Sequence, residues 1–247
     1  MTDSINKKDC VSIVIPAYNE EKRIRKSITE LRYYLKSRKL RHEIIVVDDG
    51  STDRTIEVLK EMSFPELRVI SITKSGKGKA VREGVLSAVY DYVFFMDADL
   101  STGVEEIGNF IGIFKKEPET DIIIGSRYIP EGSEITQPPF RSLVGKTFSL
   151  VKSALLGINY YDSQCGFKAF RKDAAMKIFP KSVIKGFSFD VEILYIAQLN
   201  NLKIKEVSVD WRHQPGGHVN ILSDSIPMLI ELFQIFANKI NYLPKAT

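Results

Sequence analysis

The stretch VFFMDAD at residues 93–99 decides the fold class, because a short apolar run ends in two carboxylates, Asp97 and Asp99. Apolar runs of this length with aromatic and β-branched residues are typical of buried strands. Open α/β sheets bind their ligands at the carboxyl ends of such strands. The two carboxylates repel each other, and a divalent cation that holds a phosphorylated substrate would compensate them. The alternative is that both residues merely cap the helix that follows.

The composition is that of an ordinary soluble globular protein, with 44% hydrophobic and 27% charged residues among 247. This length suits one α/β domain with a substantial core. The net charge of +4 is too small to indicate nucleic-acid binding, although it suits an anionic substrate or a membrane surface. Two cysteines, Cys10 and Cys165, exclude a disulfide framework. The first ten residues are polar and unlike a signal peptide, so we expect a reducing, cytoplasmic setting.

Predicted strands alternate with predicted helices along most of the chain. After the first strand, for example, Ile24, Ile28 and Leu31 recur at helical spacing. The expected strands are residues 10–16, 42–48, 67–72, 92–97, 121–125 and 203–210, and the expected helices are residues 20–40, 53–62, 77–90 and 104–115. Strands separated by helices predict an α/β fold with a mostly parallel sheet and right-handed crossovers.

Three polar clusters follow three of these strands. They are PAYNE at residues 16–20, DDGSTD at residues 48–53 and DAD at residues 97–99. Because the carboxyl ends of parallel strands share one edge of a sheet, we expect the clusters to converge. Each cluster could alone be turn chemistry, since Pro, Gly, Asn and Asp favour turns.

The first two clusters have the chemistry that a nucleoside needs. The ring of Tyr18 could stack on a nucleobase. A carboxylate at Asp48 or Asp49 could accept an N–H of that base, and Glu20 could accept from a ribose hydroxyl.

These segments, in this order, resemble the inverting glycosyltransferases of family 2, which have the GT-A nucleotide-diphospho-sugar transferase fold. The shared segments are PAYNE at 16–20, VDDGSTD at 47–53, GKG at 76–78 and DAD at 97–99. Two later segments, DSQCGFK at 162–168 and FDVE at 189–192, resemble the dolichyl-phosphate β-glucosyltransferase branch. The resemblance covers residues 11–211 and implies a mostly parallel central sheet flanked by helices.

The resemblance also implies roles for individual residues. Asp97 and Asp99 would hold Mg²⁺ or Mn²⁺ on the donor diphosphate, with Asp99 as the direct ligand. Ser101 stands where mannosyl relatives have Gln, which favours glucose over mannose. The residues implied in nucleotide binding are Pro16, Ala17, Tyr18, Glu20, Asp48, Asp49, Lys77 and Asp97, and those implied in catalysis are Asp99, Arg127 and Asp190.

Cationic side chains are expected on the acceptor side, where one anion must approach another. Arg127 follows a predicted strand into the same cleft, and its planar fork matches phosphate oxygens. Arg141 matches an acceptor-phosphate arginine of the lipid-phosphate transferases, although Gly145 stands where relatives offer a hydroxyl. Lys168 is a further candidate for the acceptor phosphate, and its alternative is a solvated surface charge.

The remaining candidates would contact the sugar, the donor or the acceptor. Asp190 would face the acceptor or a sugar hydroxyl and act as the base if one is used, or it is simply a helix N-terminal acid. Asp162 and Gln164 would contact sugar hydroxyls or shape a turn. Arg212 and His213 lie in a loop that resembles one closing over the diphosphate in this family, and the alternative is a polar turn.

The last part of the chain bears on membrane association. We divide the chain into a GT-A domain at residues 1–220 and an amphipathic helical segment at residues 221–247. Polar residues interrupt the apolar stripe of this segment, so a bilayer-spanning helix is not expected. The segment would lie in the membrane interface, or pack on the core or on a partner subunit. Residues 140–158 have a similar interfacial character.

Together these observations predict a metal-dependent inverting transfer of a hexose from a nucleotide diphosphate sugar to dolichyl or another polyprenyl phosphate. UDP-glucose is the favoured donor. The enzyme would associate peripherally with the cytoplasmic face of a membrane. The alternatives are a GDP-mannose-dependent polyprenyl-phosphate mannosyltransferase, a transferase acting on a saccharide, and a non-catalytic sugar-nucleotide binding module. The oligomeric state is left open.

Overall fold

The computed structural model describes residues 9–128, 139–212, 214 and 221–244, without the side chains of residues 139–144, 146 and 221–225. Within these residues, seven strands form one sheet in the order β3-β2-β1-β4-β6-β5-β7. The strands are β1 (Cys10–Ala17), β2 (Arg41–Asp48), β3 (Leu67–Ser71), β4 (Tyr92–Met96), β5 (Ile122–Ser126), β6 (Phe167–Arg171) and β7 (Ile204–Ser208). All neighbouring pairs are parallel except those made by β6, which is antiparallel to β4 and β5. The expected α/β fold with a mostly parallel sheet is therefore confirmed.

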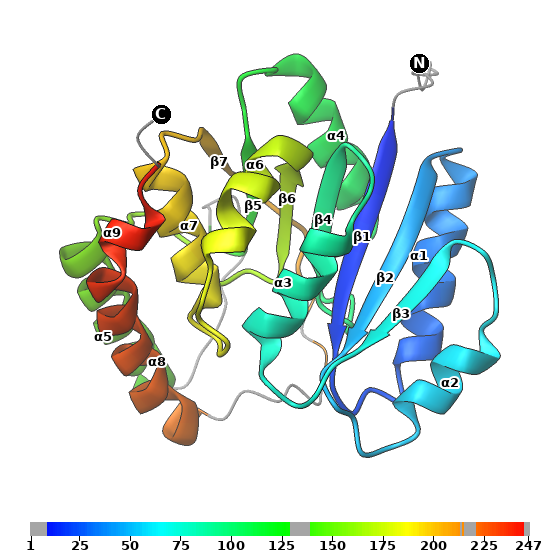
Figure 1. The fold of residues 1–247 in the computed structure, drawn as a ribbon, viewed down its shortest axis with the longest axis horizontal. Helices are drawn as coiled ribbons and strands as arrows, with labels where there is room; N and C mark the ends of the chain where they lie inside the picture. The colour runs from blue at the N-terminus through cyan, green and yellow to red at the C-terminus, as the bar shows by residue number, and fades with distance from the viewer. Residues whose placement is uncertain (1–8, 129–138, 213, 215–220, 245–247) are drawn as a thin grey trace.

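Helices cover both faces of the sheet (Figure 1). Their bounds are α1 (Ile24–Ser37), α2 (Thr55–Glu61), α3 (Lys77–Ser87), α4 (Glu106–Lys116), α5 (Pro139–Leu156), α6 (Lys172–Ile178), the 3-10 helix η1 (Phe179–Lys181), α7 (Phe189–Leu199), α8 (Ile221–Ala237) and α9 (Lys239–Tyr242). One apolar core lies between the sheet and helices α3, α6, α7 and α8, and a second lies under α1, α2 and α4. The strands carry large apolar side chains on both faces because both faces are covered.

Two differences from the sequence expectation bear on the site. The strand β6 was not anticipated, because its sequence Phe-Lys-Ala-Phe-Arg contains two cations yet lies between two other strands. The first helix begins at Ile24 rather than near Glu20. Asn19 has a left-handed backbone, with φ of 54°, and the backbone N–H of Glu20 donates to the Thr55 hydroxyl, so this segment forms a turn first.

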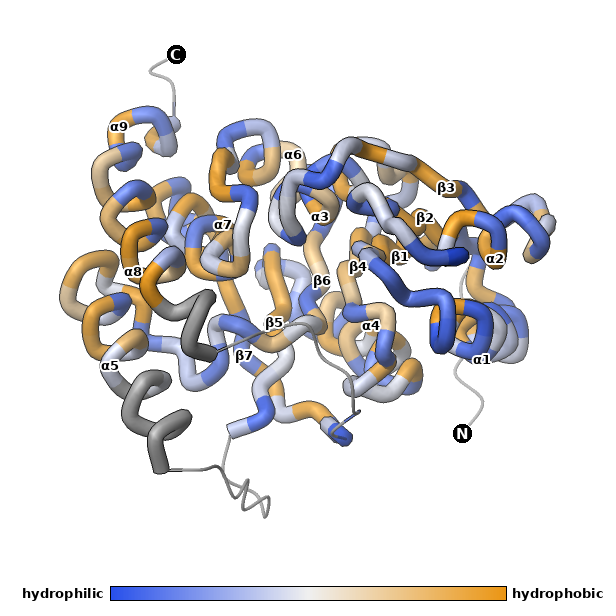
Figure 2. The backbone as a smooth tube through the Cα atoms, turned by 90° about the horizontal axis from the view of Figure 1, so that it is seen from below, coloured by the Kyte–Doolittle hydropathy of each residue, from blue (hydrophilic) through white to orange (hydrophobic). Residues whose placement is uncertain are grey.

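The C-terminal helices pack on the core through one face only. Leu232, Ile235 and Tyr242 are fully buried in the same core as α7. The opposite face of α8 and α9 exposes Ile230, Phe233 and other large apolar side chains. Figure 2 shows α5 and α8 together at one side of the molecule, far from α1 and α2. Among the described helices, none is long and apolar enough to cross a bilayer.

Candidate functional site

The first two polar clusters interlock at the carboxyl edge of the sheet. The backbone N–H of Asn19 donates to Ser51 Oγ at 2.9 Å, and the backbone N–H of Thr52 donates to Asn19 Oδ1 at 2.8 Å. The N–H of Asp49 donates to the carbonyl of Ala17 at 2.8 Å, which joins the ends of β1 and β2. The expected convergence of these two clusters is therefore confirmed.

Asp48 and Asp49 are both buried, and each organises a turn. The Asp48 carboxylate accepts the backbone N–H of Ser51 at 3.2 Å. The Asp49 carboxylate accepts the N–H groups of Ser75 at 2.7 Å and Gly76 at 2.9 Å. A carboxylate has about four lone-pair positions, so these bonds leave acceptor capacity for a base N–H. Asp49 also ties the second cluster to the Gly-Lys-Gly segment.

The aromatic ring of Tyr18 and the carboxylate of Asp49 share a neighbour, Lys74. The ammonium of Lys74 lies 2.8 Å from the centroid of the Tyr18 ring and 3.5 Å from Asp49 Oδ2. Pro16 is half-buried and Ala17 is buried at the end of β1, directly before this ring. The end of β1 therefore presents a ring face and a cation next to a buried acid.

The third cluster is joined to the Gly-Lys-Gly segment by an ion pair. Lys77, the first residue of α3, places its ammonium 2.6 Å from Asp97 Oδ1. The backbone N–H of Asp97 donates to the carbonyl of Gly166 at 3.1 Å. A Cβ at Gly166 would overlap the Asp97 carboxylate, so a larger residue there would displace that carboxylate. No role was predicted for Gly166, although a glycine next to a strand is a signal of close approach.

Asp97 and Asp99 fit a hard divalent cation. Both are part-exposed at the end of β4, and Asp99 Oδ1 accepts the backbone N–H of Ser101 at 2.9 Å, which orients that carboxylate. Mg²⁺ and Mn²⁺ prefer oxygen ligands, and Mg²⁺ usually takes one or two carboxylates together with substrate phosphates and water. Within the described residues no group of three or more acidic, His or Cys side chains could hold a metal, so phosphate oxygens and water would complete this site.

Lys168 and Asp190 form a buried ion pair, and the charge of Asp97 also acts on Asp190. Lys168, on β6, has no exposed surface, and its ammonium lies 2.5 Å from Asp190 Oδ1 and 2.6 Å from the carbonyl of Cys165. The alternative of a solvated surface charge for Lys168 is therefore wrong, and the ammonium acts here as the counter-ion of Asp190. Burial raises the pKa of Asp190, whereas the charges of Lys168 and Lys77 oppose that rise.

Arg127 is held by a bidentate pair with Asp162. Its Nε lies 2.6 Å from Asp162 Oδ2 and its Nη2 lies 3.0 Å from Asp162 Oδ1. Asp162 is itself buried, and its backbone N–H donates to Glu206 at 2.7 Å. The pKa of Arg127 is raised because this hydrogen-bonded carboxylate outweighs the effect of burial. Asp162 thus orients the arginine, and both of its carboxylate oxygens bond Arg127.

The segment after β7 lies against the Asp97–Asp99 loop. The backbone N–H of Arg212 donates to the carbonyl of Ser101 at 2.7 Å, and Trp211 forms an isolated bridge with Thr102. The guanidinium of Arg127 lies 5.5 Å from the centroid of the Trp211 ring. Sequence analysis did not single out Trp211. A hollow beside Asp97 is lined by Met96, Asp97, Leu100, Ser101, Thr102, Gly166 and Trp211.

For the remaining predicted site residues, the part of the chain that the structure describes gives no side-chain hydrogen bond or ion pair with the clusters above. The Arg212 side chain is exposed and bonds Asp210 at 2.9 Å. Gln164 is half-buried in the turn before β6. Arg141 lies in the first turn of α5, but its side chain is outside the described residues, as is all of His213.

Glu20 gives the site a titratable group near neutral pH. Burial raises the pKa of Glu20 to about 7, the charges of Asp99 and Asp97 add to this rise, and Arg23 opposes it. A carboxyl whose pKa is higher in the folded than in the unfolded state stabilises the fold below the unfolded pKa, and this contribution is lost as pH rises through the folded value. Protonated Glu20 therefore favours folding at acidic pH.

Glu20→Gln should have a higher free energy of unfolding than the unmodified protein. We expect this difference to grow as pH rises from 5 to 8, by up to about 3 kcal/mol. Urea unfolding at several pH values measures this difference. Adding Mn²⁺ with UDP should reduce this difference in free energy of unfolding, because a cation near Asp97 and Asp99 would offset the charges that raise the pKa of Glu20. Glu57→Gln, at an exposed position on α2, is the matched control. A difference that stays constant with pH would contradict the raised pKa.

The fold and the site define a class of protein. A mostly parallel sheet covered by helices on both faces, with polar clusters and an acidic pair at its carboxyl edge, is the architecture of the GT-A nucleotide-diphospho-sugar transferases. The sequence matches Glycosyl transferase family 2 over residues 12–179. This chain belongs to that family, and it is a glycosyltransferase.

Relatives of known sequence extend the match over most of the chain. A dolichyl-phosphate beta-glucosyltransferase of Trichomonas vaginalis is 35% identical over 91% of this chain and 72% of its own length. The human dolichyl-phosphate beta-glucosyltransferase is 36% identical over 83% of this chain and 68% of its own length. The Saccharomyces cerevisiae protein of the same name is 32% identical over 90% of this chain and 72% of its own length.

Solved structures share the fold at lower identity. Glucosyl-3-phosphoglycerate synthase from Mycobacterium tuberculosis in complex with UDP superposes with a TM-score of 0.70 at 19% identity, covering 96% of this chain and 82% of that one. The same enzyme with Mn²⁺, UDP-glucose and phosphoglyceric acid superposes with a TM-score of 0.68 at 18% identity, covering 96% and 81%.

Proposed function

We propose that this chain transfers glucose from UDP-glucose, with inversion at the anomeric carbon, to dolichyl phosphate or another polyprenyl phosphate, and that Mg²⁺ or Mn²⁺ takes part. Relatives at 32–36% identity that are named for this reaction support the substrates. The Mn²⁺ and UDP-glucose bound by a protein of the same fold support the cation and the donor. The observation that carries the proposal is the cluster of Lys77, Asp97 and Asp99 at the edge of the sheet.

The donor would lie along the ends of β1, β2 and β4. Tyr18 would stack on the uracil, and Asp48 or Asp49 would accept its N–H. Glu20, once ionised, would accept from a ribose hydroxyl. The two carboxylates at the end of β4 would hold the cation, which supplies Lewis-acid stabilisation of the departing diphosphate. Lys77 adds a positive charge beside Asp97 and would bind a diphosphate oxygen.

The acceptor phosphate would enter from the side of β5 and α7. Its oxygen is already anionic near neutral pH, so the site needs positive charge more than a strong base. Arg127, whose fork Asp162 orients, would bind the phosphate together with Arg141. Asp190 would act on the acceptor or on a sugar hydroxyl. Lys168, its ion-pair partner, would stabilise the negative charge of Asp190. Gln164 and Arg212 would complete the sugar and donor contacts.

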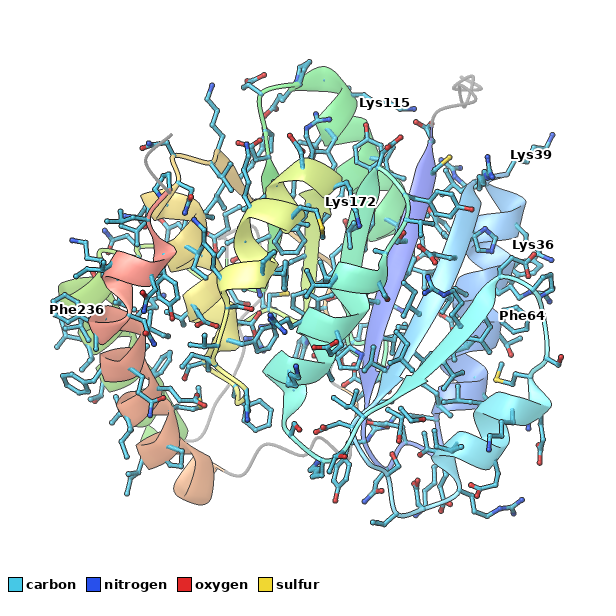
Figure 3. All side chains as sticks on the ribbon, in the orientation of Figure 1. Lys36, Lys39, Phe64, Lys115, Lys172 and Phe236 are labelled. Carbon is cyan, nitrogen blue, oxygen red and sulfur yellow. The ribbon has the colours of Figure 1, made fainter. Side chains whose placement is uncertain are left out.

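A membrane surface is the natural partner of an enzyme whose acceptor is a lipid. An outward apolar stripe on α8 and α9 supports this docking. It consists of Ile226, Ile230, Phe233, Phe236 and Ile240, with Leu243 directly after α9, and Leu150 of α5 is exposed as well. Figure 3 shows Phe236 at the outer side of the molecule, on α8. We place the enzyme at the cytoplasmic face, since both cysteines are free thiols, which suits a reducing compartment.

We expect the double variant Phe233→Asp/Phe236→Asp to bind vesicles of phosphatidylcholine and phosphatidylserine at least tenfold more weakly, because two exposed rings lose their apolar contact with lipid. Co-sedimentation with the vesicles measures this loss. Tyr33→Asp, on α1 at the other side of the molecule, should bind like the unmodified protein. Equal binding by all three proteins would mean that α8 does not dock on the membrane.

Incubation with radiolabelled UDP-glucose and polyprenyl phosphate in detergent tests the reaction itself. The expected product is labelled lipid whose formation stops with EDTA and resumes with Mn²⁺ or Mg²⁺. Labelled GDP-mannose in a parallel reaction should give little product. Label in a water-soluble saccharide would reject the lipid acceptor, and the absence of product from either donor, with UDP still bound, would indicate a binding module.

A further inference from the structure

The loop at residues 182–188, between η1 and α7, lies directly behind the proposed diphosphate site. Its Lys185 carbonyl accepts the backbone N–H of Gly78 at 2.8 Å, in the first turn of α3. A Cβ at Gly76 would overlap the same carbonyl, so loop and helix are in close backbone contact. Lys77 lies between these two glycines, and the loop leads into α7, where Asp190 lies. The loop therefore supports two proposed site residues.

Two carboxylates hold the backbone of this loop. Glu192 accepts the backbone N–H groups of Val183 at 2.8 Å and Ile184 at 3.0 Å. Glu231, on α8, accepts the backbone N–H of Ser188 at 3.1 Å. Because each bond joins a backbone donor to a carboxylate, these contacts are of the stronger, charge-assisted kind.

Both carboxylates are tied to the C-terminal helices. Glu231 belongs to α8, and the Ser188 hydroxyl donates to the Met228 carbonyl of the same helix at 3.1 Å. Ser188 precedes α7, yet its hydroxyl does not cap that helix and bonds α8 instead. The buried hydroxyl of Tyr242, on α9, donates to Glu192 Oε1 at 2.6 Å. The loop is thus fastened to α8 and α9 by specific polar contacts in addition to apolar packing.

We propose that Glu231 is a positioning residue for catalysis: by holding the Ser188 amide, it fixes the start of α7 with Asp190 and, through the loop, the start of α3 with Lys77. This inference rests on the proposed function in that it takes Asp190 and Lys77 as groups that face the substrates. Its consequence is a mechanical link between α8, whose outer stripe meets the lipid, and the centre of the site. The two ends of the link are only one loop apart.

Kinetics of Glu231→Ala test the proposal with UDP-glucose and polyprenyl phosphate in detergent, well below the unfolding midpoint of each protein. Misplacement of a reacting group by 1 Å can lower rates on the order of a hundredfold, so we expect kcat to fall tenfold or more. The KM for UDP-glucose should change less than kcat, because Tyr18 and Asp48 lie outside this link and Lys77 is the proposed donor-binding residue within it. Glu231→Gln retains an acceptor oxygen for Ser188 and should recover most of the lost kcat.

Gln234→Ala is the matched control, since Gln234 is exposed on the same helix. It should keep the kcat of the unmodified protein. If Glu231→Ala does not fold, Glu231→Asp, which keeps the charge but shortens its reach, should lower kcat instead. An unchanged kcat in a folded Glu231→Ala or Glu231→Asp protein would overturn the proposal, as would a Glu231→Gln protein as slow as Glu231→Ala.

Hydrogen exchange separates this inference from the reaction itself, because it needs no acceptor. The backbone amides of Gly78 and Ser188 should exchange at least tenfold faster in Glu231→Ala than in Gln234→Ala, while the amides of β1 keep their rates. If the unmodified protein makes no glucolipid, the proposed function fails and exchange alone decides whether Glu231 holds the loop. If it makes glucolipid and exchange is unchanged, only the positioning role fails.

Discussion

Asp99→Asn is expected to lower kcat for glucolipid formation about a thousandfold, equivalent to ~4 kcal/mol of lost transition-state stabilisation. Asparagine retains the Oδ1 atom that accepts the Ser101 N–H, so the loop after β4 keeps its shape. What disappears is one of the two negative charges that would hold the cation on the diphosphate. The variant should therefore fold normally and fail at leaving-group departure.

Steady-state rates at saturating Mn²⁺ measure this effect, with Asp173→Asn as the matched control. Asp173 is an exposed aspartate in the first turn of α6, so the control removes one surface charge and should change kcat less than twofold. Higher Mn²⁺ should restore part of the activity of Asp99→Asn if the lesion is weaker metal binding. An Asp99→Asn protein with undiminished kcat would show that the cation is held elsewhere or is not needed.

The strands that carry the proposed nucleotide-binding residues could be predicted from sequence because each is a continuous apolar run followed by a polar cluster. The strands β1, β2 and β4 begin and end within one residue of the expected positions. Their order in the sheet then brings the three clusters together without further information. Local chemistry and sheet topology agree in this half of the molecule, which is why the prediction succeeds.

The proposed acceptor side of the site could not be predicted in the same way. The strand β6 contains Lys168 and Arg171, which read as surface residues, and only the tertiary fold supplies the partner that makes burial of Lys168 possible. Asp190 lies 22 residues away from Lys168. Glu231 likewise bonds Ser188 across 43 residues, and no periodic pattern reports such a contact. Polar pairs between residues far apart in the chain form only on folding, so local sequence patterns cannot predict them.

The second large effect is expected at the buried pair of Lys168 and Asp190. The side chains of both residues are almost completely buried, at 0% and 4% exposure. Removing one partner of a buried pair leaves the other without compensation and typically costs about 3–5 kcal/mol. We therefore expect Lys168→Met, which preserves the length of the side chain, to lower the free energy of unfolding by about this amount, measured by urea unfolding at pH 7.

Replacing both partners separates stability from activity. Lys168→Met/Asp190→Leu removes both charges and fills their space with apolar groups, so its stability should return to within about 1 kcal/mol of the unmodified protein. Asp190→Asn should stay folded, because the amide oxygen can still accept from Lys168. Both variants should nevertheless lose at least about a hundredfold in kcat while binding UDP normally, since the acceptor side has lost its carboxylate.

These outcomes distinguish a structural pair from a catalytic one. If the double variant regains stability and turns over normally, Lys168 and Asp190 serve folding alone, and the acceptor must be handled by Arg127 and its neighbours. If Lys168→Met is as stable as the unmodified protein, then Lys77, whose charge also acts on Asp190, is sufficient to compensate the buried carboxylate. Loss of turnover in both Asp190→Asn, which keeps Lys168, and a double variant of normal stability would assign Asp190 to the chemistry, because neither a folding defect nor the loss of Lys168 could account for it.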